Sequence, residues 1–181
     1  MDISEPAEYA MLGLLQSRPM HGYEMIQQFK NGILGEIIHL EMSQMYAFLK
    51  KLERLKYITA QLEAQGSRPP RRIFHLTALG RSTFFSWLTE PVTRPREVRI
   101  LFLIKLYFVR QLQPEQTVPL VEQQILAGRR FLEHLESKHA LHANTDDAAF
   151  FEHVVLRGRI YQTRSLLDWL YELKRELASS V

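Results

Sequence analysis

The chain has 181 residues, of which 46 % are hydrophobic and 24 % are charged, and its formal net charge is +3. This length accommodates one ordinary domain or two small ones. The lack of cysteine excludes disulfides and thiolate zinc sites. The longest near-continuous apolar run, residues 100–109, is too short to span a bilayer. Because Asp2 and Glu5 stand where a signal peptide would be basic, we expect a cytoplasmic protein with no membrane partner.

The N-terminal part of the chain predicts two helices. The first is expected over residues 8–16 and ends at Ser17-Arg18-Pro19, because proline does not continue a helix. The second is expected over residues 21–31, where apolar side chains recur at helical spacing. Gly32 and Gly35 then break the pattern.

A third helix is expected over residues 43–56. Ser43 is the predicted N-cap, although no Glu or Gln stands three residues later to complete a capping box. A polar side chain such as Gln44 at the start of this helix could pair with adenine in the major groove, and cations further along could contact phosphate. An ordinary amphipathic helix with a solvated basic face shows the same pattern. The predicted outward face consists of Ser43, Gln44, Ala47, Lys50, Lys51 and Arg54.

A two-stranded hairpin is expected next. Its strands cover residues 57–63 and 71–76, and a turn-rich loop over residues 65–70 joins them. Arg68, Arg71 and Arg72 cluster at its tip, where a stiff cationic loop can lie along phosphate or enter the minor groove. Thr77 is then expected to cap a fourth helix that reaches about residue 89 and ends before Pro91.

Positive charge is concentrated in this part of the chain. Residues 50–81 hold eight Lys and Arg side chains against two Asp and Glu, whereas residues 1–49 hold two against six. Such a block is the charge distribution expected of a surface that binds a polyanion, although a solvated basic surface has it too. Taken together, the third helix and the hairpin predict double-stranded DNA as the partner.

The second half of the chain predicts helices alone. Residues 96–112 are apolar on nearly all sides, which indicates burial against a protein partner as well as an internal core. Further helices are expected over residues 114–140 and 147–177, the last one with Asn144-Thr145-Asp146-Asp147 as its cap and N-terminal acids. Two long antiparallel helices form a dimer element or an intramolecular bundle.

No catalytic or metal-binding pattern is present in the sequence. Phosphate-binding glycine loops, nucleophile motifs and a His-Glu-x-x-His motif are all missing, so we expect neither an enzyme nor a cofactor. The histidines lack the spacing of a zinc set. Five aromatic side chains could line a pocket for an aromatic ligand or belong to the core: Trp87, Phe102, Tyr107, Phe108 and Trp169.

Several motifs occur in an order and spacing that resembles the PadR-like transcriptional regulators. The C-terminal half is similar to the helical dimerisation region of the longer members, with Arg96-Glu97 near its start and Trp169-Leu170-Tyr171-Glu172 near its end. The N-terminal motifs that carry the resemblance are Leu12–Leu15, Pro19–Ile26, Ser43–Tyr46, Leu49–Glu53 and Arg68–Arg81.

The resemblance implies a mainly α protein, with a winged helix-turn-helix DNA-binding domain at residues 1–90 and a helical dimerisation domain at residues 91–181. It implies a homodimeric, sequence-specific repressor that a small-molecule effector releases from DNA. The effector's identity does not transfer, because the family uses aromatic acids, drugs and other ligands, and a small aromatic effector is one candidate. The rival hypothesis is a winged-helix module for protein–protein interaction. Met42-Ser43-Gln44 and Ala47 depart from the usual start of the family's third helix, so the base preference does not transfer. The expected DNA-binding residues are Tyr23, Ser43, Gln44, Tyr46, Ala47, Lys50, Lys51, Arg54, Arg68, Arg71 and Arg72.

Overall fold

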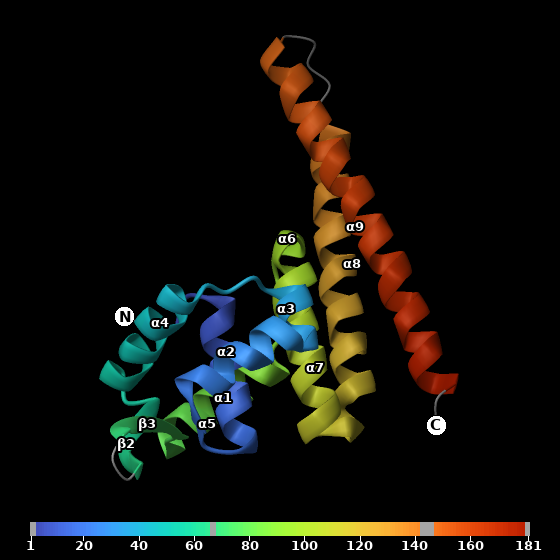
Figure 1. The fold of residues 1–181 in the computed structure, drawn as a ribbon. Helices are drawn as coiled ribbons and strands as arrows, with labels where there is room; N and C mark the ends of the chain where they lie inside the picture. The colour runs from blue at the N-terminus through green and yellow to red at the C-terminus, as the bar shows by residue number, and fades with distance from the viewer. Residues whose placement is uncertain (1–2, 66–67, 142–146, 180–181) are drawn as a thin grey trace. The chain divides into compact units, whose positions relative to one another are not determined.

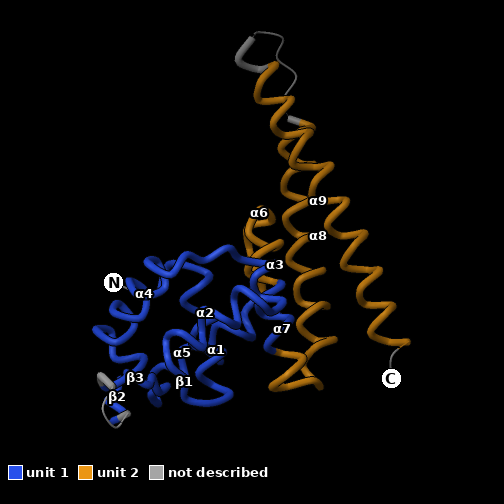
Figure 2. Tube along the Cα trace, viewed as in Figure 1, with its two compact units in different colours: residues 1–90, 103–108 blue, residues 91–102, 109–181 orange. Residues whose placement is uncertain are grey.

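The chain folds into two compact units in the computed structural model, which describes residues 3–65, 68–141 and 147–179 (Figure 1). The first unit contains residues 1–90 and 103–108, and the second contains residues 91–102 and 109–181 (Figure 2). We expected a single boundary at residue 90, but the structure also assigns residues 103–108 to the first unit. Among the described residues, no helix has both the length and the apolar content needed to cross a membrane.

Three of the helices predicted for the first unit are confirmed, as α1 (Pro6–Ser17), α2 (Gly22–Asn31) and α4 (Met42–Arg54). A short helix that was not predicted, α3 (Ile33–Ile37), lies between α2 and α4. These helices pack through side chains spaced three or four residues apart, as an apolar helical stripe requires. The buried side chains include Met11 and Leu12 of α1, Met25 and Ile26 of α2, and Met45, Leu49 and Leu52 of α4.

The start of α4 differs from the predicted one. The N-cap is Glu41 rather than Ser43, and Ser43 lies inside the first turn of the helix. Gln44 stands three residues after Glu41, and its Oε1 accepts a hydrogen bond from the Glu41 backbone N–H at 3.1 Å. The helix therefore does have the capping-box partner that counting from Ser43 excluded.

The wing is part of a three-stranded antiparallel sheet with the order β1-β3-β2. Strands β2 (Ile58–Gln65) and β3 (Arg68–Leu76) form the predicted hairpin, with Ile58 opposite Leu76 and Leu62 opposite Arg72. Because β3 begins at Arg68, the expectation of a loop over residues 65–70 is wrong for most of that segment. The third strand, β1 (Met20–His21), was not predicted, and it pairs with β3 just before α2 begins.

Helix α5 (Ala78–Thr89) follows the sheet and has the predicted cap, since the Thr77 hydroxyl accepts a hydrogen bond from the Gly80 backbone N–H at 3.0 Å. The Thr77 hydroxyl also lies 2.8 Å from the Lys56 carbonyl oxygen, to which it donates, so this residue joins α5 to the end of α4. A Cβ atom at Gly80 would collide with the Tyr57 carbonyl oxygen, so glycine is required where α5 crosses the start of β2.

Lys105 is buried at the C-terminal end of α5, with 2 % of its surface exposed. It belongs to the part of α7 (Leu103–Leu112) that lies in the first unit. Its ammonium donates hydrogen bonds to the carbonyl oxygens of Trp87 and Glu90 and lies 4.3 Å from the centre of the Trp87 ring. A lysine at this position provides donors for the last carbonyl groups of the helix and complements the negative end of its dipole.

Lys105 is expected to make the stability of the protein depend on alkaline pH. Burial lowers the pKa of Lys105 from 10.5 to about 8. The unfolded chain therefore binds this proton up to higher pH than the folded protein, and the free energy of unfolding rises with pH in this window. Between about pH 7.5 and 9.5, the wild type should gain about 2 kcal/mol relative to Lys105→Met in urea unfolding. Parallel pH profiles of the two proteins would contradict a buried lysine.

The second unit consists of helices. A short helix, α6 (Pro95–Glu97), leads into a π-helical turn over Val98–Phe102, where a single regular helix over residues 96–112 was expected. A 3₁₀ turn at Pro114–Gln116 precedes α8 (Thr117–Leu141), and the last helix is α9 (Asp147–Ser179). The predicted cap at Asn144-Thr145-Asp146 lies outside the described residues.

Helices α8 and α9 pack against each other as an antiparallel pair (Figure 1). Leu135, Leu156 and Ile160 form a buried cluster between them. Nearer the other end of the pair, the ring of Trp169 meets the buried ring of Phe102 edge to face, with 5.9 Å between their centres. The Gln124 side chain forms two hydrogen bonds with the backbone of Val92, which attaches the entering chain segment to α8. This arrangement gives the second unit a core of its own.

Candidate nucleic-acid interface

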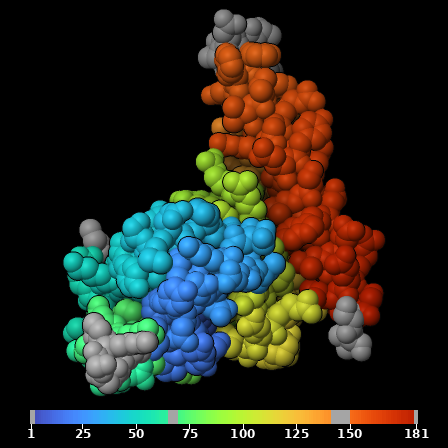
Figure 3. Space-filling model, in the orientation of Figure 1, coloured from blue at the N-terminus to red at the C-terminus, as the bar shows by residue number. Residues whose placement is uncertain are grey.

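A groove of about 860 Å³ lies between α2, α4 and β3 of the first unit. Tyr23 of α2 is exposed on one side of it, and Lys50 of α4 and Arg71 of β3 line it as well. Tyr46 lies across the start of α2, where a Cβ atom at Gly22 would meet its ring at 3.0 Å. Figure 3 shows the surface of the first unit, with α2 and α4 in blue to cyan and the wing in green.

One side of α4 presents most of the residues that were expected to meet DNA. Met45, Leu49 and Leu52 point into the core, and this burial leaves the opposite face open. The face combines short polar groups near the N-terminus of α4 with cations towards its end, as the sequence predicted. Its exposed members are Ser43, Gln44, Tyr46, Ala47, Lys50 and Arg54.

Gln44 has two functions open to it in this structure. Its Oε1 is occupied by the Glu41 backbone N–H, whereas bidentate pairing with adenine requires both the oxygen and the amide nitrogen. Its side chain is exposed, so exchanging one hydrogen bond for the other does not require repacking of the core. The amide oxygen has two lone pairs, so pairing with a base adds to the capping bond or replaces it, and the amide N–H groups are the donors to the base.

Lys51 does not lie on the open face, and the prediction of its outward position is wrong. Its side chain is only 21 % exposed and contacts the fully buried carboxylate of Glu8 at 2.8 Å. Its ammonium also donates to the Ser4 hydroxyl at 3.0 Å. The Glu8 carboxylate accepts backbone N–H groups of Ser4 and Glu5 as well, at 2.9 and 3.0 Å. Lys51 therefore attaches α4 to the start of α1.

The wing arginines differ in their surroundings. Arg71 is exposed. Arg72 donates to both carboxylate oxygens of Glu53 on α4, at 2.6 and 2.8 Å, and its guanidinium lies 5.2 Å from the centre of the Phe74 ring. Arg68 is the first residue of β3, and its side chain lies outside the described part of the structure. Both bonds to Glu53 come from one terminal nitrogen of a side chain that is 51 % exposed, so the remaining N–H groups of Arg72 can meet a phosphate while the ion pair stays formed.

His21 fastens the wing to the start of α2. Its Nδ1 donates to the Arg72 carbonyl oxygen at 3.0 Å, and its Nε2 lies 3.1 Å from a carboxylate oxygen of Glu63 on β2. The backbone N–H of His21 donates to Glu24 at 2.7 Å. This hydrogen bond, with a further contribution from Arg18, holds the pKa of the Glu24 carboxyl below its usual range. These contacts fix the geometry of the groove before any ligand is bound.

Three acidic residues of this region were missed in the sequence: Glu8, Glu53 and Glu63. For Glu8 the sequence did contain a signal, because it stands three and four residues before Met11 and Leu12 and so shares their buried stripe. A charged group on such a stripe indicates a buried ion pair. Glu53 and Glu63 carried no local signal, since their partners Arg72 and His21 are distant in the sequence.

The other candidate sites have structural explanations. Phe108 is buried with Phe84 in the first unit, and Phe102 is buried in the second. Trp87 stacks on Tyr9 with 4.2 Å between ring centres. The described residues contain no group of three or more His, Asp or Glu side chains arranged to hold a metal ion.

Comparison with known proteins agrees with this geometry. Residues 11–85 match the family described as transcriptional regulator PadR-like, and residues 98–178 match the one described as virulence activator alpha C-term. The negative transcriptional regulator PadR of Bacillus subtilis is 28 % identical over 169 residues, which are 90 % of this chain and 92 % of that protein. A probable transcriptional regulator of Mycobacterium tuberculosis is 25 % identical, over 93 % of this chain and 96 % of its own.

Among solved structures, the crystal structure of Bacillus subtilis PadR in complex with operator DNA is 26 % identical, covers 96 % of this chain and 99 % of its own, and has a TM-score of 0.48. The PadR-like match covers the helices and the wing that form the groove, and the motifs quoted for the N-terminal half lie within it. The PadR relative extends over both units. The matched part of the first unit, residues 11–85, is of the PadR-like family of transcriptional regulators.

Proposed function

We propose that this protein is a homodimeric repressor that binds operator DNA through the groove between α2, α4 and the wing. The observation that supports it most directly is the exposed face of α4, where Gln44, Ala47 and Lys50 stand over a buried stripe and beside the cationic wing. A helix with such a face fits the major groove, and the wing then lies along the phosphate backbone. The relative described as a negative transcriptional regulator supports repression rather than activation.

Each exposed residue has a place in this proposal. Ser43, Gln44 and Ala47 lie closest to the N-terminus of α4, where helices of this type contact base edges. Tyr23, Tyr46, Lys50, Arg54 and Arg71 would contact phosphate and hold the register of the helix on the duplex. Arg72 would join them through the N–H groups that Glu53 does not use, and Arg68 would extend the contact along the wing. Lys51 would act through the position of α4 and not through DNA.

The test of this proposal is a set of duplexes that tile the region upstream of the protein's own gene. We expect one duplex to be bound far more tightly than random DNA, with an affinity that falls steeply as salt rises. Fluorescence anisotropy with labelled duplexes over a salt series measures both properties. Equal affinity for all duplexes at every salt concentration would refute sequence-specific binding, and the rival interpretation as a protein-interaction module would then return.

Gln44→Ala is expected to lower the affinity for the preferred duplex by roughly 1–3 kcal/mol, and to have little effect on random DNA, because a bidentate base contact is lost. The matched comparison is Arg72→Ala, which should weaken binding to all duplexes alike and flatten the salt dependence. If Gln44→Ala weakens random and preferred duplexes equally, Gln44 contacts no base.

The proposal includes a small aromatic effector that releases the repressor from DNA. Such an effector must bind the DNA-free form more tightly than the DNA-bound form, and the coupling is reciprocal. Adding aromatic compounds singly to the preformed complex, with anisotropy as the readout, identifies which of them lowers the affinity.

A further inference from the structure

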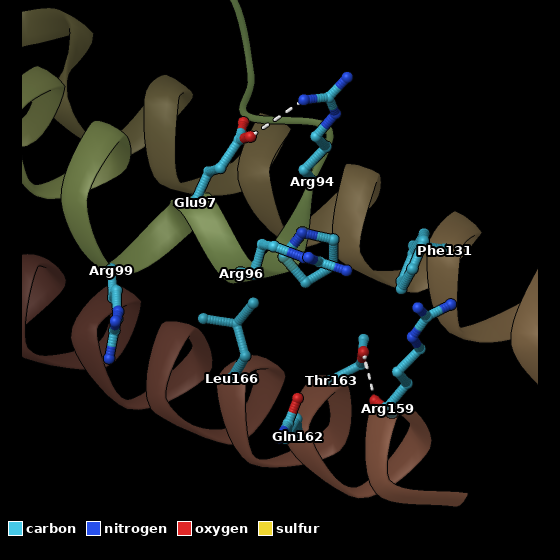
Figure 4. Close-up of a pocket in the computed structure, with 10 residues that line it drawn as sticks. Arg94, Arg96, Glu97, Arg99, Phe131, Arg159, Gln162, Thr163 and Leu166 are labelled. Atoms are coloured by element: carbon cyan, nitrogen blue, oxygen red, sulfur yellow. Dashed lines mark hydrogen bonds and ion pairs between the residues drawn. The ribbon is translucent and has the colours of Figure 1, made fainter. Parts of the chain in front are cut away.

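A cavity of about 620 Å³ lies within the second unit, between α6, the π-helical turn, α8 and α9 (Figure 4). Its volume is in the range of sites for small organic ligands, roughly 300–1,000 Å³. Arg96 of α6, Arg99 of the π-helical turn and Arg159 of α9 line it, together with Phe131 of α8. It shares no residue with the groove between α2, α4 and the wing.

The arginines of this cavity lack acidic partners. Arg94 also lines it, but its guanidinium is 3.2 Å from Glu97, whose charge it balances. Within the part of the chain that the structure describes, no carboxylate pairs with Arg96, Arg99 or Arg159. Three guanidinium groups that line one cavity without carboxylate partners leave their charge available to a bound anion.

The remaining lining is suited to an apolar body. Phe131 and Leu166 are half-buried and contribute apolar surface. The Thr163 hydroxyl donates to the Arg159 carbonyl oxygen at 2.8 Å within α9, so it offers a ligand little. In Figure 4, Arg96 and Arg159 extend towards the end of the cavity near Phe131, Arg99 lies at the other end, and Leu166 lies between. Cations around an apolar surface match an organic ligand that carries two negative charges.

The backbone beneath Arg99 supports a ligand site independently. Val98–Phe102 form a π-helical turn, an arrangement that is rare in proteins and frequent at functional sites. The turn carries Arg99 on one side and the buried side chains of Val98 and Phe102 on the other. Its irregular backbone therefore places a cation at the cavity while two anchors remain in the core.

We infer that this cavity binds a small organic dianion, with two carboxylate groups or one phosphate ester group, on an aromatic or aliphatic body. Guanidinium groups bind carboxylate and phosphate oxygens through paired hydrogen bonds, so a dicarboxylate and a phosphate ester are both suitable ligands. The inference gives a charge and a place to a small-molecule site, and only its link to the effector rests on the proposed function. Anion binding itself does not depend on DNA.

Isothermal titration calorimetry on the full chain without DNA tests the inference. The probes are terephthalate and phenyl phosphate as the two kinds of dianion, benzoate as the monoanion, and benzamide as the neutral analogue. We expect saturable binding of at least one dianion, about tenfold tighter than benzoate, and no binding of benzamide. Which dianion binds distinguishes a dicarboxylate site from a phosphate ester site.

Arg96→Gln and Arg159→Gln should each weaken the bound dianion about tenfold. The matched control is Arg130→Gln, since Arg130 is exposed on α8 next to Phe131 and does not line the cavity. An equal loss in Arg130→Gln would show non-specific attraction and overturn the site. So would a lack of saturable binding by both dianions, or variants that change only self-association in sedimentation. Because DNA is absent throughout, none of these results bears on operator binding.

Discussion

Lys51→Met is expected to lower the free energy of unfolding by about 3–5 kcal/mol, because it leaves the buried Glu8 carboxylate without its cation. Glu8 is fully buried, and without Lys51 it keeps only the backbone N–H groups of Ser4 and Glu5. The reverse change should cost less. In Glu8→Gln the amide oxygen still accepts those N–H groups, and the partly exposed Lys51 can turn to water, so we expect a loss of roughly 1–3 kcal/mol.

Urea unfolding of the two single variants and the double variant measures the coupling between the residues. The double variant removes both charges and should be more stable than Lys51→Met alone. Lys50→Met is the control, since Lys50 is the exposed neighbour on the same helix, and its effect should stay within about 0.5 kcal/mol. Additive losses in the double variant would show that the pair contributes nothing as a pair.

For DNA binding we expect the reverse: substitution of Lys50 should have the larger effect, and substitution of Lys51 the smaller one. Lys50 is exposed at the groove, so Lys50→Met should remove about one phosphate contact and lower the slope of log affinity against log salt by about 0.9. Lys51 is held by Glu8 and Ser4, and Lys51→Met should leave that slope unchanged in protein that is still folded. The opposite result would place Lys51 on DNA.

Much of the fold could be predicted from local pattern. The apolar positions indicated α1, α2 and α4, and Thr77 as a cap with Pro91 as a stop indicated α5. The hairpin followed from extended segments around a turn-rich tip, although β3 begins earlier than predicted. These features depend on residues close together in the sequence, which is why the winged helix-turn-helix was predictable.

What was missed depends on contacts between distant residues. Strand β1 has two residues, and it is a strand because Met20 and His21 pair with Phe74 and Ile73 of β3. Gly35 was interpreted as a helix breaker, but it lies within α3, where a Cβ atom would collide with the Phe29 carbonyl oxygen. Helical periodicity predicts which side of a helix is apolar, but it does not predict which distant carboxylate will pack against that side.

The candidate site shows the same limit. Outward position on α4 was predictable from the buried stripe, and it holds for Gln44, Ala47, Lys50 and Arg54. It fails for Lys51, at the edge of the stripe, where a long side chain reaches a partner on α1. The capping role of Gln44 could not be predicted, because the N-cap is Glu41, two residues before the expected Ser43. Helix ends are set by capping groups that compete within a few residues.

Several large apolar side chains are exposed together at the start of α9. Phe150, Phe151, Val154 and Val155 occupy consecutive turns of the helix, and each is about half exposed or more, with Phe151 at 67 %. Soluble monomers rarely expose several large apolar side chains together, and such patches mark interfaces. We therefore expect this surface to be part of the proposed homodimer interface.

Phe151→Glu combined with Val155→Glu is expected to convert the dimer to monomers in analytical ultracentrifugation, because two carboxylates would be buried without partners at the interface. The monomer should bind a duplex with two half-sites at least about 100-fold more weakly, since the second half-site is no longer held at high effective concentration. Its affinity for a single half-site should not change. Gln123→Glu adds one carboxylate on the exposed side of α8 and should remain dimeric. A double variant that stays dimeric would place the interface elsewhere on the second unit. If the variant is monomeric but binds the paired half-sites with unchanged affinity, dimerisation does not contribute to operator binding.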